Sequence, residues 1–186
     1  MNIGFLASHG GSNMQAIIDA CKSGALKARP VVVISNNSDS GAIERAKREG
    51  IPHYYLSSKT HPDPDELDQT IQETFVRHEV DIVALAGYMK KLGPKTLSRF
   101  HGRVLNIHPA LLPKFGGPGM WGIHVHEAVI AAGEQESGVT IHFVDENYDT
   151  GRIIAQTRVS VVPGDTPETL AARVLEQEHK LYPATL

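Results

Sequence analysis

The sequence contains very little cysteine and no long hydrophobic run. Cys21 is the only cysteine among 186 residues, which excludes an internal disulfide framework and a zinc site built from several cysteines. No stretch approaches the roughly 18 apolar residues of a membrane-spanning helix, and the first residues lack the basic segment and long apolar core of a signal peptide. We therefore expect a cytoplasmic protein in a reducing compartment, with no membrane partner.

The chain also lacks an excess of positive charge. Its formal net charge of −3 at pH 7 offers no general attraction for nucleic acid or an anionic membrane surface, both of which favour clustered lysine and arginine. Its composition, 41% hydrophobic and 21% charged residues, is typical of a soluble globular protein. One domain spanning residues 1–186 is the simplest prediction for this length. Any anion site must then be local.

Short apolar runs of strand length alternate with helical patterns in the first part of the chain. The runs cover residues 3–7, 31–35, 82–86 and 104–107. Between them, segments 13–21 and 65–78 each place apolar residues on one helical face, which predicts crossover helices. Cys21 lies on the first of these faces and is predicted to be in the core. The alternation predicts an α/β fold with an open, mostly parallel twisted sheet and helices on both faces.

The second part of the chain predicts two more strands and two more helices. A helix is expected near His124–Ala132, strands near Val139–Val144 and Ile153–Val161, and a helix from Pro167, which follows a threonine that can start it. Before them, residues 108–122 carry three prolines and four glycines without periodicity. Loops of this length are usually functional or mobile.

A glycine-rich turn follows the first predicted strand. Residues 8–13, Ser-His-Gly-Gly-Ser-Asn, lead directly into a helix, and main-chain N–H groups in such a turn can hold a phosphate at the helix N-terminus. The alternative is an ordinary turn in which Ser12 or Asn13 only caps the helix. The turn lacks the spacing of a dinucleotide fingerprint or a P-loop, so neither a dinucleotide nor a nucleoside triphosphate is indicated.

An amide and an imidazole stand together at the end of the strand predicted for 104–107. Alternation along the strand places Asn106 and His108 on the same side of the chain, and Pro109 ends the strand. Ligands bind at the carboxyl ends of strands in open α/β sheets. The position favours a functional role, although a single histidine can also be structural.

An acidic loop, residues 144–151, separates two predicted strands. As a structural feature it is a solvated turn, with Asp149-Thr150-Gly151 as turn residues. As a functional feature it brings one carboxylate to an imidazole and raises the basicity of that imidazole. The spacing leaves both interpretations open.

Five segments taken together resemble the glycinamide ribonucleotide formyltransferases, the folate-dependent enzymes of purine synthesis. They are residues 11–17, 85–89, 105–113, 122–128 and 138–151, in the order and spacing of that family. The resemblance implies a formyltransferase fold with a Rossmann-like N-terminal half. It also implies transfer of a formyl group from 10-formyltetrahydrofolate, the co-substrate, to the amine of glycinamide ribonucleotide. Neither a metal nor a nucleic acid is implied, and the enzyme would be a monomer or a homodimer.

The resemblance also assigns residues to roles. The catalytic residues would be Asn106, His108 and Asp149. A residue that supports them would be His142. The acceptor would be held by Gly11, Ser12, Asn13 and Glu178. The folate would be held by Tyr88, Met89, Lys90, Leu92 and Asp145. Within the one domain, a mononucleotide-binding half would cover about residues 1–100, and a folate and catalytic half about residues 101–186.

Three positions depart from the usual pattern of the family. His9 stands where relatives commonly carry a small or amide residue, and Arg152 where they commonly carry proline. The segment His61–Asp65 replaces a more usual basic or serine-containing entry to the next helix. These departures concern the phosphate turn, the shape of the acidic loop and a basic contact, respectively. The family pattern also implies a closing strand or helix beyond Leu186.

Three other functions remain as alternatives. A formyltetrahydrofolate hydrolase would use water in nearly the same site, and the turn at residues 11–13 argues against it. A formyltransferase acting on aminoacyl-tRNA would favour a basic surface or an added domain, and the sequence shows neither. A non-catalytic ligand-binding module could share the fold, but it would not need the three catalytic residues.

Overall fold

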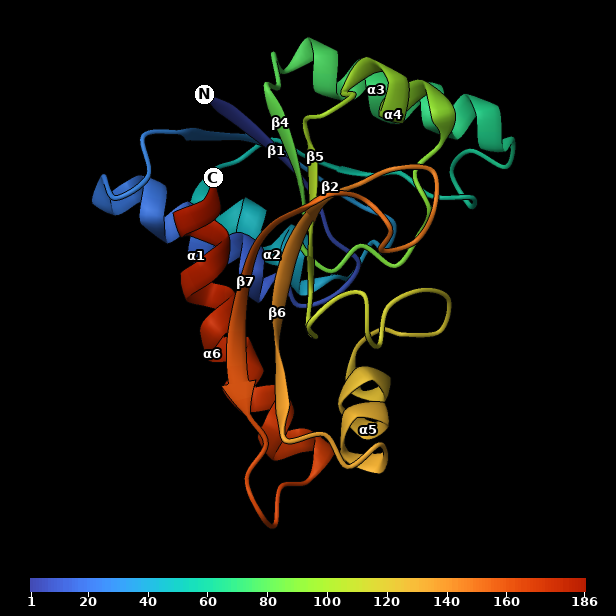
Figure 1. Cartoon of the computed structure of the whole chain (residues 1–186). Coiled ribbons are helices and arrows are strands. Elements are labelled where there is room, and N and C mark those ends of the chain that lie inside the picture. The colour runs from blue at the N-terminus through green and yellow to red at the C-terminus, as the bar shows by residue number, and fades with distance from the viewer. The chain divides into compact units, whose positions relative to one another are not determined.

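The computed structural model describes residues 1–186 as seven strands and six helices (Figure 1). Hydrogen bonding orders the strands β3-β2-β1-β4-β5-β6-β7. Strand β1 pairs in parallel with β2 and with β4, and β2 pairs in parallel with β3. Strands β6 and β7 pair antiparallel. The predicted α/β class with a mostly parallel sheet is confirmed. Along the chain, two units can be distinguished, residues 1–105 and residues 106–186.

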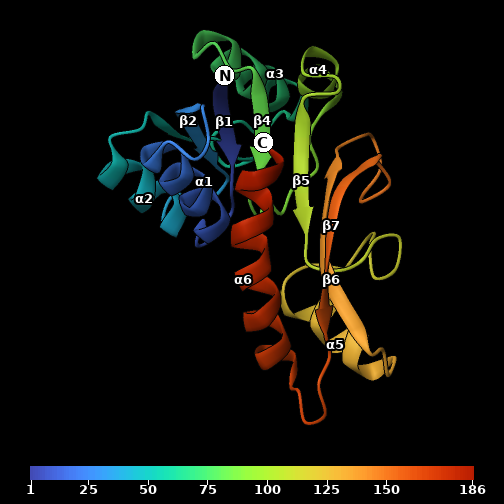
Figure 2. The same cartoon turned by 60° about the vertical axis from the view of Figure 1, so that its left-hand side comes forward.

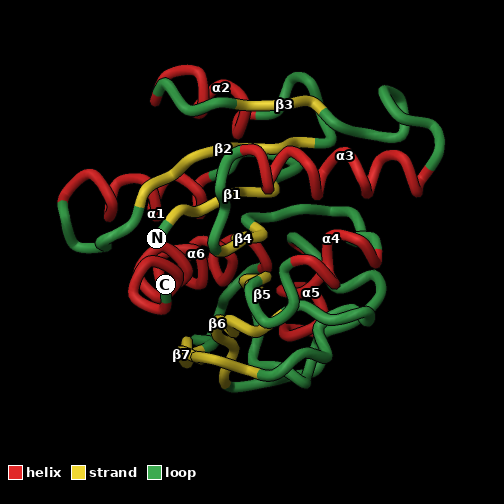
Figure 3. Tube along the Cα trace, turned by 90° about the horizontal axis from the view of Figure 1, so that it is seen from above, coloured by secondary structure: helices red, strands yellow, loops and turns green.

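The first unit contains four strands and four helices. The strands are β1 (Asn2–Leu6), β2 (Arg29–Ser35), β3 (His53–Tyr55) and β4 (Ile82–Leu85). The helices are α1 (Ser12–Ser23), α2 (Gly41–Glu49), α3 (Pro64–Arg77) and α4 (Pro94–Arg99). Figure 3 shows α1 and α3 on opposite faces of these strands. The apolar runs of the sequence form the buried centre, because strands covered on both faces expose almost none of their side chains.

The second unit continues from β5 (Val104–His108), the strand in which one unit passes into the other. It contains α5 (Ile123–Ala131), β6 (Glu136–Phe143), β7 (Ile153–Ser160) and α6 (Pro167–Thr185). Helix α6 packs against β6, β7 and α5 (Figure 2). The side chain and main chain of Thr166 exchange hydrogen bonds with those of Thr169, which fixes the start of α6 where the sequence predicts it.

Three short elements were not predicted from the sequence. Helix α2 buries only the small apolar surface of Ala42, Ile43 and Ala46, and β3 has three residues. Helix α4 has six residues, and a distant residue fixes its start: the carboxylate of Asp68 on α3 accepts hydrogen bonds from the N–H groups of Lys95 and Thr96. None of these elements carries the long periodic pattern that makes an element recognisable.

Cys21 differs from its prediction as a core residue. Its side chain is only half-buried, although burial still raises the pKa of its thiol. The neighbouring apolar residues of the same helix, Met14, Ile17 and Ile18, are buried as predicted. No helix in the chain is both long and apolar enough to cross a membrane.

Candidate active site

The structure brings Asn106, His108 and Asp149 together at the end of β5. Asp149 comes from the loop between β6 and β7, and its Oδ2 lies 3.6 Å from His108 Nδ1. Its Oδ1 lies 3.4 Å from Nε2 of His142 on β6. The same His142 nitrogen is 3.2 Å from the amide nitrogen of Asn106. One carboxylate therefore stands between two buried imidazoles, with an amide beside the second imidazole.

Each imidazole in this cluster uses one ring nitrogen to bind a main-chain carbonyl. His108 Nε2 is 2.7 Å from the carbonyl oxygen of Phe115, and His142 Nδ1 is 2.8 Å from that of Phe143. Because a carbonyl only accepts hydrogen bonds, each of these nitrogens carries a proton. The other nitrogens, His108 Nδ1 and His142 Nε2, face Asp149. A second proton on either ring would thus be placed beside a carboxylate.

Burial and charge act in opposite directions on the acid–base groups of the cluster. Burial lowers the pKa of His108 below its usual value, against the opposing effects of Asp149 and the Phe115 carbonyl. Burial alone would raise the pKa of Asp149. The neighbouring His142, the charge of His108 and the N–H of Gly117 outweigh it, so the net pKa of Asp149 is lowered. The carboxylate is therefore charged at neutral pH, and His108 loses a proton easily.

The loop after His108 is held against β6 by a buried hydroxyl. Thr140 Oγ1 donates to the carbonyl oxygen of Ala110 at 2.6 Å and accepts from the N–H of Leu112 at 3.0 Å. Gln156 on β7 donates to the same hydroxyl at 2.8 Å. Further along the loop, the N–H of Gly117 donates to Asp149 Oδ2 at 2.9 Å. The loop is thus tied both to the sheet and to the carboxylate.

A cavity of about 350 Å³ opens beside Asp149. Its walls are Leu112, Pro113, Gly116, Gly117, Tyr148, Asp149, Thr150, Gly151 and Ile153. Asp145, assigned to folate by resemblance, lies in the same loop as Asp149. Its carboxylate accepts hydrogen bonds from the N–H of Asn147 and the hydroxyl of Thr150, so it shapes the loop that forms this wall.

A second cavity, of about 330 Å³, contains a histidine that sequence reasoning missed. Glu178 on α6 and His126 on α5 both line it, and both are buried. Nδ1 of His126 has no hydrogen-bond partner. Burial, followed by the charge of His108, lowers the pKa of His126. The only signal in the sequence was its place in segment 122–128, which contains two histidines separated by one residue.

In the first unit, the glycine-rich turn stands directly before α1. Gly11 occupies the N-cap position with a φ of 69°, and no side chain caps the helix. The alternative in which Ser12 or Asn13 caps the helix is therefore wrong. His9, which departs from the family pattern, is exposed at the start of this turn. The N–H groups in the first turn of a helix have no acceptor within the helix itself, so the start of α1 can bind an anion.

The segment assigned to folate in the first unit follows β4. Burial raises the pKa of Tyr88 to about 12, Leu92 is buried, and Met89 and Lys90 are exposed. The N–H of Met89 donates to Ser8 Oγ at 2.7 Å, and this hydroxyl donates to Asn36 Oδ1 at 2.6 Å. The segment is thus tied to the end of β1.

At the remaining two departures from the family pattern, the side chains make contacts with residues nearby in the chain. The guanidinium of Arg152 lies over the ring of Phe143, 4.8 Å from its centroid. His61 Nδ1 lies 3.0 Å from the hydroxyl of Thr60, and Asp63 caps α3 by accepting from the N–H of Asp65. Neither departure removes a contact of Asp149.

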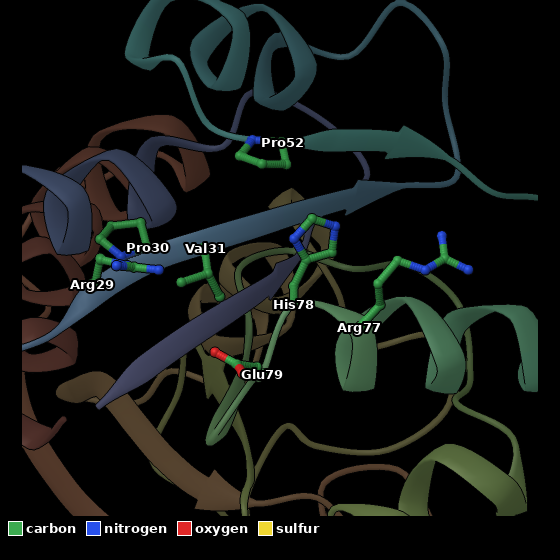
Figure 4. A pocket seen from close by; sticks show the side chains of 7 residues that line it. All are labelled: Arg29, Pro30, Val31, Pro52, Arg77, His78 and Glu79. Atoms are coloured by element: carbon green, nitrogen blue, oxygen red, sulfur yellow. The ribbon is translucent and has the colours of Figure 1, made fainter.

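A further cavity of about 330 Å³ lies at the amino end of β2 (Figure 4). Arg29 and Arg77 line it together with His78 and Glu79. Ligands of open α/β sheets bind at the carboxyl ends of the strands, so this cavity lies at the wrong edge for the active site. Nowhere in the chain do three or more histidine, cysteine or acidic side chains form a group that could hold a metal ion.

Comparison with known proteins agrees with the resemblance seen in the sequence. The formyl transferase family matches residues 1–186. A chloroplastic phosphoribosylglycinamide formyltransferase of Arabidopsis thaliana is 46% identical over 176 residues, 94% of this chain and 60% of that protein. The phosphoribosylglycinamide formyltransferase of Haemophilus influenzae is 42% identical over 99% of this chain and 84% of its own length. The chain thus spans about 60% of the plant relative and most of the bacterial one.

Solved structures show the same likeness. The crystal structure of phosphoribosylglycinamide formyltransferase from Bacillus halodurans superposes with a TM-score of 0.92 at 40% identity, covering 100% of this chain and 93% of that chain. That of glycinamide ribonucleotide transformylase 1 from Geobacillus kaustophilus gives a TM-score of 0.92 at 40% identity, covering 100% and 96%. With sequence and fold in agreement over its full length, the chain belongs to the formyl transferase family.

Proposed function

We propose that this chain is a cytoplasmic enzyme that transfers the formyl group of 10-formyltetrahydrofolate to the amine of glycinamide ribonucleotide. The observation that carries the proposal is the cluster at the end of β5, in which Asp149 stands between His108 and His142 with Asn106 beside them. The names of the relatives support formyl transfer and the phosphoribosylglycinamide acceptor, and the formyl transferase family supports a folate donor.

The chemistry requires charge stabilisation and a path for one proton. Attack of the uncharged amine on the formyl carbon turns the carbonyl oxygen into a tetrahedral oxyanion. The amide N–H of Asn106 can donate to this oxygen without any change of protonation. Protonated His108 stabilises the same oxygen and then passes its proton to the departing folate nitrogen, while Asp149 holds the imidazolium. The proton lost by the attacking amine restores His108.

The two substrates would be held by different parts of the chain. The acceptor phosphate would bind the N–H groups of Gly11, Ser12 and Asn13 at the start of α1, where the helix dipole favours an anion. Glu178 would contact the acceptor from its cavity in the second unit. For folate, the resemblance assigns the segment Tyr88–Leu92 in the first unit and Asp145 in the second. The cavity beside the Asp145 loop combines apolar side chains with the carboxylate of Asp149.

The test is an assay of the purified protein with formyl-folate and glycinamide ribonucleotide. We expect formyl transfer to the amine, with little formate released when the acceptor is absent. Inorganic phosphate should compete with the acceptor and not with folate, because it occupies only the turn before α1. Rapid formate release without acceptor, unaffected by phosphate, would defeat the transferase and favour the hydrolase.

A further inference from the structure

Arg45 on α2 lies against the glycine-rich turn that precedes α1. Its Nε donates to the carbonyl oxygen of Gly10 at 2.8 Å, and its Nη1 donates to Gln15 Oε1 at 3.4 Å. Both acceptors are neutral, so neither contact compensates the charge of the guanidinium. Nothing in the sequence pointed to Arg45, because 35 residues separate it from Gly10.

The contacts of α2 determine which way the peptide groups of the turn point. The carbonyl oxygen of His9 accepts from the N–H of Ala42 at 3.0 Å, and that of Gly10 accepts from Arg45. In a trans peptide, the carbonyl and the N–H of the next residue point in opposite directions. The N–H groups of Gly10 and Gly11 therefore point away from α2. With both carbonyls turned towards α2, the opposite side of the turn presents donors.

The turn packs closely against the start of α2 at Gly11 and at the Gly10 carbonyl. A Cβ atom on Gly11 would lie 3.0 Å from Ala42 Cα, and one on Gly41 would lie 3.0 Å from the carbonyl oxygen of Gly10. The start of α2 is fixed in turn by Ser40, whose side chain accepts from the N–H of Ile43. Arg45 thus acts from a fixed helix on a closely packed turn.

We propose that Arg45 is a positioning residue for the acceptor phosphate. It holds the Gly10 carbonyl away from the anion, directs the N–H of Gly11 towards it, and adds a positive charge behind the turn. The inference rests on the proposed function, because it assumes that the turn binds the phosphate of the acceptor. Arg45 does not touch the reacting atoms, so it should affect acceptor binding and not turnover.

A neighbouring arginine provides a matched control. Arg48, one turn further along α2, donates to Gln15 Oε1 at 3.1 Å but has no contact with the turn. Arg45→Met and Arg48→Met remove the same charge from the same helix and keep the aliphatic part of the side chain. Only the first removes the hydrogen bond to Gly10.

The experiment measures the KM of each substrate, kcat, the inhibition constant of inorganic phosphate and the thermal midpoint for both variants. We expect Arg45→Met to raise the KM of the acceptor and the inhibition constant of phosphate by about tenfold each, with the KM of folate and kcat nearly unchanged. Arg48→Met should change both KM values, kcat and the inhibition constant of phosphate by less than about twofold. Arg45→Lys should recover part of the loss, because it keeps the charge.

Several outcomes would overturn the inference. Equal effects of the two methionine variants would show that Arg45 contributes only general charge. A fall in kcat or in the thermal midpoint that accounts for the whole effect would show a merely structural role.

Binding of phosphate can also be followed without turnover, by its effect on the thermal midpoint. If phosphate stabilises the wild type and not Arg45→Met, yet no formyl reaches the acceptor, then the proposed function fails while the role of Arg45 stands. If phosphate has no effect on the wild type, the role of Arg45 fails.

Discussion

The two parts of the chain that the proposal uses are built in different ways. The turn before α1 presents main-chain N–H groups, whose donor character does not change with pH. The cluster at the end of β5 consists of side chains, and two of them, His108 and Asp149, have shifted pKa values. Acceptor binding should therefore respond to changes in backbone geometry at the turn, whereas formyl transfer should respond to changes in protonation at the cluster.

Loss of the amide or the imidazole should have the largest effect. We expect Asn106→Ala and His108→Ala to lower kcat by roughly 100- to 1,000-fold, because each removes a donor that acts on the oxyanion. The KM values should change much less, since these contacts strengthen only in the transition state. Steady-state kinetics measures both. His101→Ala, at an exposed histidine, is the control. Wild-type turnover in either variant would remove that residue from the mechanism.

Neutralising the carboxylate should come next and should be visible in the pH profile. Asp149 raises the pKa of His108 against the effect of burial, so in Asp149→Asn the pKa of His108 falls further. If His108 acts as a cation, the alkaline limb of kcat moves to lower pH, and turnover near neutral pH falls by about a hundredfold. A pH series for wild type and variant measures the shift. An unchanged alkaline limb would contradict the cationic role.

A methyl group in the turn should weaken acceptor binding without changing kcat. Gly11 and Gly24 both have positive φ, so alanine at either position costs about 1–2 kcal/mol of stability. Only at Gly11 would the new methyl lie against Ala42, since nothing lies within 4 Å of a Cβ at Gly24. We expect Gly11→Ala to raise the KM of the acceptor about tenfold, with kcat unchanged and with no such effect from Gly24→Ala. Equal KM values for the acceptor in the two variants would show that the turn does not bind the acceptor.

Removing the hydroxyl that holds the loop after His108 should have the smallest effect on activity. Thr140→Val keeps the shape of the side chain but leaves the buried partners of its hydroxyl without a hydrogen bond. We expect a loss of about 1–3 kcal/mol in the free energy of unfolding, measured with denaturant, and only a few-fold change in kcat. Thr157→Val, the same substitution on the neighbouring strand β7, is the control. An equally stable Thr140→Val would show that this hydroxyl does not hold the loop.

The sequence was sufficient for features determined by neighbours along the chain. Alternation along β5 predicted that Asn106 and His108 share a side, and a glycine-rich turn before a helix was visible directly. Contacts between distant segments could not be predicted in this way. The carboxylate of Asp68, on α3, accepts the hydrogen bond that fixes the start of α4. Arg45 donates to the carbonyl oxygen of Gly10, 35 residues earlier in the chain. The contact between His142 and Asn106 depends on the packing of β6 in the fold, which no local pattern encodes.

The hydroxyl of Ser8 connects the two segments of the first unit that the proposed function assigns to the substrates. Ser8 stands two residues after the end of β1, at the first residue of the turn, and its hydroxyl accepts from the N–H of Met89 in the segment assigned to folate. A replacement at residue 8 would therefore disturb donor and acceptor affinities together, whereas the variants above separate them. Under the proposed function, a change at residue 8 that adapts the protein to a new acceptor would therefore also alter its affinity for the folate donor.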